Sequence, residues 1–540
     1  MPIPRFLSQP AFSIFSIIFA VLNRGIFSYF TSSIGKDKRL HITMAENLLN
    51  GKGLGATKYY LNDVYKPVFD LSQPFPPGYS LLVSPFLKLF NNDEYMAATT
   101  LDVLIAVVFV LVIRWVCKTI GLNTPATNLV TIIAGCFQYT FFLYSTPTDA
   151  LCLTLLFAGI GQAINMSKLD AVSINARHII LTGCLFFLPG FFRYISVPIG
   201  LLLSLLLLAT AYVKKDKTFI RKSFLIFLVV SVFTISLFLF LYFYSGSTPP
   251  TYYTQKGFYP RNLIHWYPFI PASFINLDFA AQRVAQIASI HYSNALTWFE
   301  ILNVVLLLIL FILLFIWYRR RKSIYPATAF GLFIHFGTIV SLLTMLLLAF
   351  LAVRWAPKAG PYSWTFVMEE RYFSPIYIFL QIAVIGWIVG TGIRKIRGWI
   401  KAIVLLAIVV LSVEIAHGIY YNAKIVLFYE AMKAKHNYQS DYLYLSSLIS
   451  KLETQFPNQE IIVASADKVY AQLAIKSGHV GIFDIENIGK FPIKVRQKSL
   501  LVLPVSQWDY WMMKDYIQVH NPKLMATVSG TRFYLLELNP

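Results

Sequence analysis

A polar stretch between two hydrophobic segments decides how this chain folds. It runs from Lys36 to Pro85 and contains KDKRLHITMAENLLNGKGLG (residues 36–55) and QPFPPGYSLLVSP (residues 73–85). The first part has the apolar spacing of an amphipathic helix that starts with a lone aspartate, Asp37. A Gly-rich break and a rigid Pro-Pro-Gly-Tyr turn follow. A long polar loop directly after a first membrane segment is unusual for a transporter and favours an enzyme that works at the bilayer surface.

The composition places most of the chain in a membrane. Of 540 residues, 57% are hydrophobic and 13% are charged, and the mean hydropathy is +0.61. Soluble globular proteins do not have this balance, so we expect an α-helical polytopic membrane protein. The net charge of +21 does not indicate nucleic-acid binding, because the basic clusters fall in short loops between apolar runs. The four cysteines show neither metal-ligand nor disulfide spacing.

Apolar segments of roughly 20 residues predict about eleven membrane-spanning helices. We expect these spans at residues 11–30, 99–117, 127–145, 149–166, 179–192, 195–213, 224–244, 299–317, 328–352, 373–391 and 401–420. Basic clusters fall on alternate loops, so all of them are cytoplasmic if the N-terminus is cytoplasmic. The clusters are Arg114/Lys118, Lys168/Arg177, Lys214–Lys222, Arg319–Lys322 and Arg394–Lys401.

The opposite, non-cytoplasmic side receives the longer polar segments, which are residues 31–98, 245–298 and 354–372 and the tail from about residue 421. The tail contains strand-like runs, IIVAS, LLVLP and FYLLEL, which predict a small α/β domain of four or five strands. We therefore expect a membrane domain over residues 1–420, whose first outer loop (31–98) carries amphipathic helices, and an extracytoplasmic α/β domain over residues 421–540.

Asp37 is the leading candidate for a catalytic group. It lies just beyond the first span, and His41 follows one turn later on the same face of the helix. Three basic neighbours, Lys36, Lys38 and Arg39, would keep the carboxylate ionised, which suits a general base. The same pattern also fits a helix N-cap or a surface ion pair.

Further candidates stand at the ends of spans on the non-cytoplasmic side. Tyr79 ends the Pro-Pro-Gly-Tyr turn, which can buttress a site or simply lead into a surface helix. Asp149 begins a span and either contacts substrate or caps the helix. Arg193 interrupts FFLPGFFRYISVPIG, in which Pro189-Gly190 are expected to break the helix. An arginine at this depth needs a phosphate or carboxylate partner, or else must reach the head groups.

The segment Glu369-Glu370-Arg371-Tyr372-Phe373-Ser374-Pro375 opens the tenth span on the same side. Arg371 could bind a phosphate through its guanidinium fork, with Glu370 and Tyr372 beside it. An ion pair between Glu370 and Arg371 at the interface is the alternative. No cluster of His, Cys and carboxylates in the sequence has metal-ligand spacing.

Taken in order, these motifs resemble those of the GT-C superfamily of integral-membrane glycosyltransferases, in the branch of protein O-mannosyltransferases and lipid A aminoarabinose transferases. The resemblance covers about residues 10–420. It rests on Arg24, Asp37 with Ala45, NLLNGKG, PPGYSLL, Thr148-Asp149, GFFRY and ERYFSP. It implies a polyprenyl-phosphate-linked sugar as donor and transfer with inversion. It implies no certain cofactor besides that donor, and a divalent metal is possible but not indicated.

The resemblance also implies roles for individual residues. Asp37 would be the general base that deprotonates the acceptor. The leaving lipid phosphate would be held by cationic groups, namely Arg371 and either Arg193 or Arg24. Asp149 would order the acceptor or the catalytic loop.

Two positions depart from the family pattern. Lys38 stands where many relatives have Glu after the loop aspartate. Phe75 stands where the aminoarabinose branch has a lysine directly before Pro-Pro, and Lys66 is the nearest candidate for that lysine.

We therefore expect a multi-pass glycosyltransferase of a bacterial inner membrane that acts on the periplasmic side on a lipid, glycan or protein acceptor. One alternative is an oligosaccharyltransferase-like enzyme that moves whole glycans. A lipid flippase or secondary transporter would show inverted repeats and charges near the bilayer midplane. A non-catalytic scaffold is the remaining alternative, and it would tolerate loss of the Asp37 carboxylate.

Overall fold

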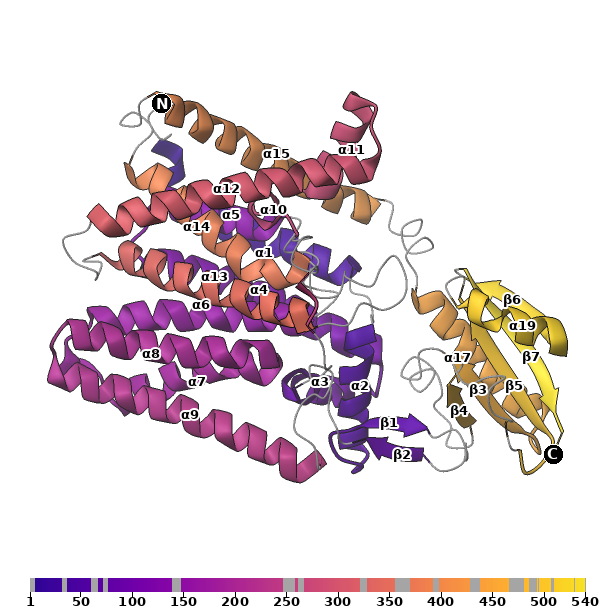
Figure 1. Ribbon diagram of the computed structural model, residues 1–540. Helices are drawn as coiled ribbons and strands as arrows, with labels where there is room; N and C mark the ends of the chain where they lie inside the picture. The colour runs from indigo at the N-terminus through magenta and orange to yellow at the C-terminus, as the bar shows by residue number, and fades with distance from the viewer. Residues whose placement is uncertain are drawn as a thin grey trace.

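The computed structural model of the chain describes residues 5–31, 36–59, 67–70, 76–137, 147–245, 258–260, 267–320, 328–354, 370–391, 398–427, 438–465, 480–484, 493, 495–506, 509–528 and 530–539. Long helices run side by side, and a β-sheet lies beyond one end of them (Figure 1). The short helices α2 and α3 lie at that same end, which is called the α2 end below.

Helices occupy all eleven segments predicted as spans. They are α1 (Pro10–Thr31), α4 (Glu94–Thr119), α5 (Thr124–Cys136), α6 (Pro147–Lys168), α7 (Ala176–Phe192), α8 (Val197–Val213), α9 (Lys217–Ser245), α12 (Tyr292–Arg320), α13 (Ala329–Arg354), α14 (Ser374–Thr391) and α15 (Trp399–Leu427). Within the described ranges, 7 helices are long and apolar enough to cross a membrane, namely α1, α4, α6, α8, α9, α12 and α13. The multi-pass membrane class is confirmed, whereas the count of about eleven spans is not.

One predicted helix end and one predicted helix break are wrong. Helix α5 ends at Cys136, because Phe137 is already extended (φ −70°, ψ 119°), so residues 127–145 are not one continuous helix. Helix α7 runs through Pro189 to Phe192, and the backbone N–H of Arg193 still donates to the carbonyl of Pro189 at 2.9 Å. A proline removes one backbone hydrogen bond, and the packing of α7 against α8 and α9 keeps the last turn helical despite that loss.

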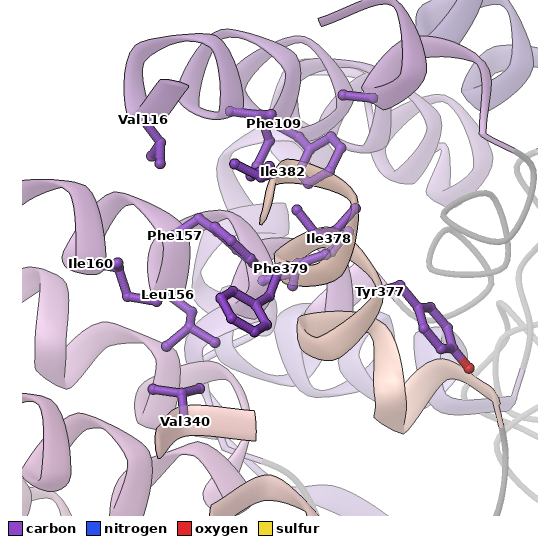
Figure 2. Close-up of a cluster of buried hydrophobic side chains, with 14 of the residues drawn as sticks. Phe109, Val116, Leu156, Phe157, Ile160, Val340, Tyr377, Ile378, Phe379 and Ile382 are labelled. Carbon is purple, nitrogen blue, oxygen red and sulfur yellow. The ribbon is translucent and has the colours of Figure 1, made fainter. Parts of the chain in front are cut away.

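The core of the bundle lies between α4, α6, α13 and α14 (Figure 2). Phe109, Phe157 and Phe379 meet there, and all three rings are buried. Gly337 of α13 makes room for the last of them, because a Cβ at this position would lie 2.1 Å from the Phe379 ring. Of the apolar window of α6, 83% is buried, against 6% for α12, so α6 lies inside the bundle and α12 on its lipid-facing side.

Short elements connect the long helices. Between α1 and α4 are α2 (Lys36–Leu49), an antiparallel hairpin of β1 (Ala56–Tyr59) and β2 (Pro67–Asp70), and α3 (Gly78–Leu89). Between α9 and α12 are α10 (Phe269–Ala272) and α11 (Leu277–Ala288). Single turns of 3-10 helix precede α8 and α14, namely η5 (Tyr194–Ser196) and η8 (Glu370–Phe373).

The C-terminal part is an α/β unit, as predicted. Its sheet has the order β4-β3-β5-β7-β6, in which β3, β4 and β5 are parallel and β7 is antiparallel to β5 and β6. The elements are α17 (Tyr438–Gln455), β3 (Glu460–Ser465), β4 (Val480–Asp484), β5 (Ser499–Val505), α19 (Tyr510–His520), β6 (Lys523–Val528) and β7 (Thr531–Leu538). All of β5 is buried, as its central place between two helix-covered faces requires. The domain boundary near residue 421 stays a prediction.

Candidate active site

Asp37 is the second residue of α2, inside the first turn of the helix rather than at its N-cap. A carboxylate in the first turn is stabilised by the helix dipole, which favours its ionised form. The side chain of Asp37 lies outside the described residues. The structure therefore positions the backbone of the candidate base at the α2 end of the bundle.

Lys38 forms a buried ion pair with Asp102 of α4. The Lys38 Nζ lies 2.5 Å from Oδ2 of Asp102, and both side chains are fully buried. Lys38 thus has a buried partner on α4, and its role as a cationic neighbour of Asp37 stays a prediction. Burying an ammonium group without a partner has a large desolvation cost in free energy, so Lys38 pairs with the carboxylate of Asp102 on the adjacent helix α4. This pair ties the first turn of α2 to α4.

Tyr79 completes this group. Its hydroxyl donates to Oδ1 of Asp102 at 3.2 Å, and the whole side chain is buried. Burial and, next, the Asp102 carboxylate raise the pKa of Tyr79 well above its usual value. Tyr79 is therefore a neutral hydrogen-bond donor that holds Asp102 in place. As a substrate contact, Tyr79 stays a prediction.

His41 is fully buried beside Tyr79. Its ring meets the Tyr79 ring edge-on with centroids 5.4 Å apart, and its Nδ1 lies 3.1 Å from Oγ of Ser80. Burial and the positive charge of Arg193 lower the pKa of His41 to about 3. His41 is therefore neutral at physiological pH and can offer a ligand a hydrogen bond but no positive charge.

Arg193 has a carboxylate partner. One terminal nitrogen, NH1, lies 2.7 Å from Oδ1 of Asp149, in the first turn of α6, and 3.5 Å from Oγ1 of Thr148. The guanidinium also lies over the ring of Tyr372, 5.3 Å from its centroid. The Arg193 and Asp149 side chains are only 11% and 8% exposed. The sequence left a phosphate or a carboxylate as the partner of Arg193. In the structure Arg193 pairs with the carboxylate of Asp149.

Gly78 explains how the Pro-Pro-Gly-Tyr turn reaches Arg193. A Cβ at Gly78 would lie 2.6 Å from the carbonyl oxygen of Phe191 and 2.7 Å from the ring of Phe192. Only glycine allows this approach, so the start of α3 packs directly on the end of α7. The segments that carry Tyr79 and Arg193 are thereby brought together, although they are far apart in the sequence.

The other predicted residues are placed less completely. Arg24 of α1 is fully buried, and its guanidinium lies 5.5 Å from the centroid of the Phe109 ring of α4. Glu370 and Arg371 belong to η8, next to Tyr372, and their side chains lie outside the described residues. Lys66 lies outside the described residues altogether.

Asp102 is the functional-site residue that sequence reasoning missed. It lies within a segment interpreted as apolar, where an ionisable residue is by itself a signal of function or of a specific partner. The sequence shows the ionisable residue, but it does not show which residue pairs with Asp102, because Lys38 is 64 residues away in the chain. Within the described ranges no group of three or more His, Cys, Asp and Glu side chains could hold a metal ion.

Comparison with known proteins gives similarity to solved structures only. No family model matches the chain, and no curated protein matches it. ArnT from Cupriavidus metallidurans bound to undecaprenyl phosphate shares 11% identity, with 97% of each chain covered and a TM-score of 0.46. AglB, an oligosaccharyltransferase from Archaeoglobus fulgidus in complex with an inhibitory peptide and a dolichol-phosphate, shares 12% identity over 93% of this chain and 70% of that one, with a TM-score of 0.49. At these values, the functional assignment depends on the residues themselves.

Proposed function

We propose that the protein is a glycosyltransferase that moves a sugar from a polyprenyl-phosphate-linked donor to an acceptor, with inversion, at the α2 end of its membrane helices. The observation that carries this proposal is the Arg193–Asp149 pair, in which the guanidinium lies over the ring of Tyr372 of η8. The start of α3, which packs on the end of α7 beside Arg193, connects this pair to His41 of α2. Four separate parts of the chain thus supply a cation and a candidate carboxylate base at one membrane edge. This is what transfer from a lipid phosphate requires.

In the proposed mechanism, Asp37 takes the proton from the acceptor hydroxyl as its oxygen attacks the anomeric carbon of the sugar. The bond between that carbon and the phosphate oxygen of the lipid breaks, and the lipid phosphate leaves with the negative charge. Arg371 and Arg193 stabilise that charge. A guanidinium has five N–H donors, so Arg193 can bind Asp149 and a phosphate oxygen at the same time. Arg24 is the alternative cation.

The buried groups around this site support the same assignment. Lys38 is fully buried and pairs with Asp102, so we assign the proposed phosphate contacts to arginines and not to this lysine. His41 is neutral and would serve as a hydrogen-bonding contact beside the sugar. The proposed lipid phosphate is of the same chemical class as the undecaprenyl phosphate and dolichol-phosphate in the two solved structures above.

The proposed location is a bacterial inner membrane with the α2 end facing the periplasm. Lysines concentrate at the opposite end of the helices, where Lys168, Lys214 and Lys222 contact backbone carbonyls. Loops rich in Lys and Arg stay in the cytoplasm, so this distribution supports the orientation. The acceptor is a lipid, a glycan or a protein.

Transfer of radiolabel tests the proposal directly. Purified protein in nanodiscs would be given radiolabelled polyprenyl-phosphate sugars and an envelope extract, and labelled products would be separated and weighed by mass spectrometry. We expect Asp37→Asn to lower the transfer rate by about 10²- to 10⁴-fold, the usual contribution of a general base. Asp170→Asn makes the same chemical change at an exposed position of the opposite end and should leave the rate unchanged.

The products also separate the alternatives. A mass increment of one sugar supports the proposed reaction, and an increment of a whole glycan would instead indicate an oligosaccharyltransferase-like enzyme. Label that crosses the bilayer without a new covalent bond would indicate a flippase. Full transfer by Asp37→Asn would exclude Asp37 as the base.

A further inference from the structure

A buried segment from Tyr267 to Leu277, here called the α10 segment, is not accounted for by the proposed function. It contains the four-residue helix α10 and ends where α11 begins. Most of its residues are buried, and Phe269, Ala272 and Ser273 are almost inaccessible to solvent. A helix this short cannot satisfy its own backbone N–H and carbonyl groups. Irregular backbone inside a membrane protein is stable only where other parts of the protein supply hydrogen-bond partners.

Those partners are buried polar side chains from three different long helices. Asn303 of α12 accepts from the backbone N–H of Ile270 at 2.9 Å. Gln381 of α14 donates to the carbonyl of Ser273 at 2.8 Å.

The third partner comes from α15, where Oε1 of Glu414 accepts from the backbone N–H of Asn276 at 2.8 Å. The side chains of Asn303, Gln381 and Glu414 are 2%, 2% and 5% exposed. Each of these polar groups lies in a long, largely apolar helix, and each is matched to one backbone group of the α10 segment.

The α10 segment packs against the turn that precedes α14. Phe269 stacks on Phe373 with ring centroids 5.0 Å apart and an interplanar angle of 5°, and Tyr267 stacks on the same ring at 6.1 Å. Phe373 is the last residue of η8 and is itself fully buried. Its neighbour Tyr372 lies over Arg193. The α10 segment therefore packs against η8 through Phe373.

We propose that Asn303, Gln381 and Glu414 are positioning residues, which hold the α10 segment against Phe373 and thereby set the place of η8 relative to Arg193. This role rests on the proposed function only in that η8 carries Arg371, the proposed phosphate ligand. Its structural part, the coupling between the three side chains and η8, stands independently. None of the three touches the reacting atoms in the proposed mechanism.

Conservative and apolar variants at the same positions separate positioning from general stability. Glu414→Gln keeps a carbonyl oxygen that can accept from Asn276, whereas Glu414→Leu does not. Asn303→Leu removes the acceptor for the backbone N–H of Ile270 in the same way. Phe269→Leu removes the stacking on Phe373 and leaves all three hydrogen bonds in place, so it tests the coupling even if a Leu variant at the other positions does not fold.

Two measurements on the full chain in nanodiscs decide the matter. Hydrogen–deuterium exchange would follow the peptides that cover residues 267–277 and 370–373, and titration with undecaprenyl phosphate would give Kd. We expect Glu414→Leu, Asn303→Leu and Phe269→Leu to speed exchange at 370–373 and to weaken binding by about tenfold, the effect of losing roughly one hydrogen bond. Glu414→Gln should behave as the unmodified protein does.

Other outcomes distinguish this inference from the proposed function. Faster exchange confined to residues 267–277, with unchanged exchange at 370–373 and unchanged Kd, would overturn the positioning role. Equal effects of the Gln and Leu replacements at position 414 would also overturn it. If the unmodified protein does not bind undecaprenyl phosphate, the proposed donor is wrong, and the exchange measurements still decide whether the α10 segment supports η8.

Discussion

The two ends of the membrane helices use charged residues in opposite ways. At the α2 end, two largely buried cations face carboxylates, in the pairs Lys38–Asp102 and Arg193–Asp149. At the opposite end, lysine ammonium groups donate to the last carbonyls of helices and turns, namely Lys168 to Thr119, Lys214 to Ser167, and Lys222 to Ala171 and Ile174. There, cations complete helix C-termini, where carbonyls have no partner within the helix and the helix dipole is negative.

The difference separates charge that orients the protein from charge that builds a site. A partly exposed lysine at a helix end costs little to place and follows the positive-inside rule. A fully buried ion pair has a desolvation cost that can exceed its Coulombic gain, so it is weak evidence for stability. The pairs at the α2 end are therefore better explained by the position they impose on α2 and on Arg193 than by the stability they add.

The largest effect should come from breaking one half of the Lys38–Asp102 pair. Lys38→Met leaves an uncompensated buried carboxylate, and we expect the free energy of unfolding to fall by about 3–5 kcal/mol. The double variant Lys38→Met/Asp102→Leu should recover most of that loss, because no buried charge remains. Thermal unfolding in detergent, arranged as a double-mutant cycle, measures both effects.

Lys88→Met is the matched control, since Lys88 is an exposed lysine of the neighbouring helix α3. It should change the unfolding temperature little. If the double variant is as unstable as the single one, the loss arises from packing rather than from unpaired charge. If the double variant also transfers sugar at the full rate, the pair does not position α2.

Removing the cation at the site should weaken donor binding next most strongly. Arg193→Ala removes a proposed charge-assisted contact to the lipid phosphate, and we expect Kd for undecaprenyl phosphate to rise about 10- to 100-fold, equivalent to roughly 1.5–3 kcal/mol. Arg283→Ala, at an exposed arginine of α11, is the control. Equal Kd values for Arg193→Ala and the unmodified protein would remove Arg193 from the phosphate site.

His41 makes stability at the α2 end depend on pH. Its pKa is about 3 in the folded chain and 6.5 when exposed, so the unfolded state binds the proton first as pH falls. The contribution of neutral His41 is fully present above pH 6.5 and is lost as pH falls toward 3. At pH 5 we expect a loss of about 2 kcal/mol relative to neutral pH, from about 1.4 kcal/mol per unit.

Unfolding temperatures of the unmodified protein and His41→Gln, compared from pH 7 to pH 5, measure this dependence. The difference between the two should narrow as pH falls, because Gln does not titrate. His520→Gln, at an exposed histidine of α19, should leave the dependence as it is. A pH dependence that His41→Gln does not alter would mean that His41 is not the titrating group.

The smallest effect should come from the opposite end. Lys222→Met removes a cation that donates to the carbonyls of Ala171 and Ile174, and we expect a loss of less than about 1 kcal/mol. High salt should weaken the contribution of Lys222 but not that of the buried Lys38–Asp102 pair. A loss as large as that of Lys38→Met would remove the contrast between the two ends.

Much of the fold could be predicted because its signals are local. Long apolar runs predicted the places of the membrane helices, and short strand-like runs predicted the strands near residues 461–465, 500–504 and 533–538. The helix after the first span was predicted from its apolar period and is α2. The helix break expected at Pro189-Gly190 is absent, because the packing around Pro189, not the proline alone, decides whether the helix continues.

The candidate site, too, could be predicted only in part from the sequence. Sequence motifs singled out Asp149, Arg193 and Tyr372 one by one, and the structure brings these three side chains into contact. The partnership of Lys38 with Asp102 was not predictable, because nothing in either local segment reveals which helix faces meet. The roles of Asp37 and Arg371 stay predictions.

By itself, the sequence determined the membrane class, the order of the helices and the α/β character of the C-terminal part, because hydropathy and periodicity are properties of contiguous residues. Only the tertiary structure decided which charges are paired and which buried polar groups hold the α10 segment. The pairing of charges and the satisfaction of backbone groups depend on distance and burial, and these are set when helices far apart in the chain pack together.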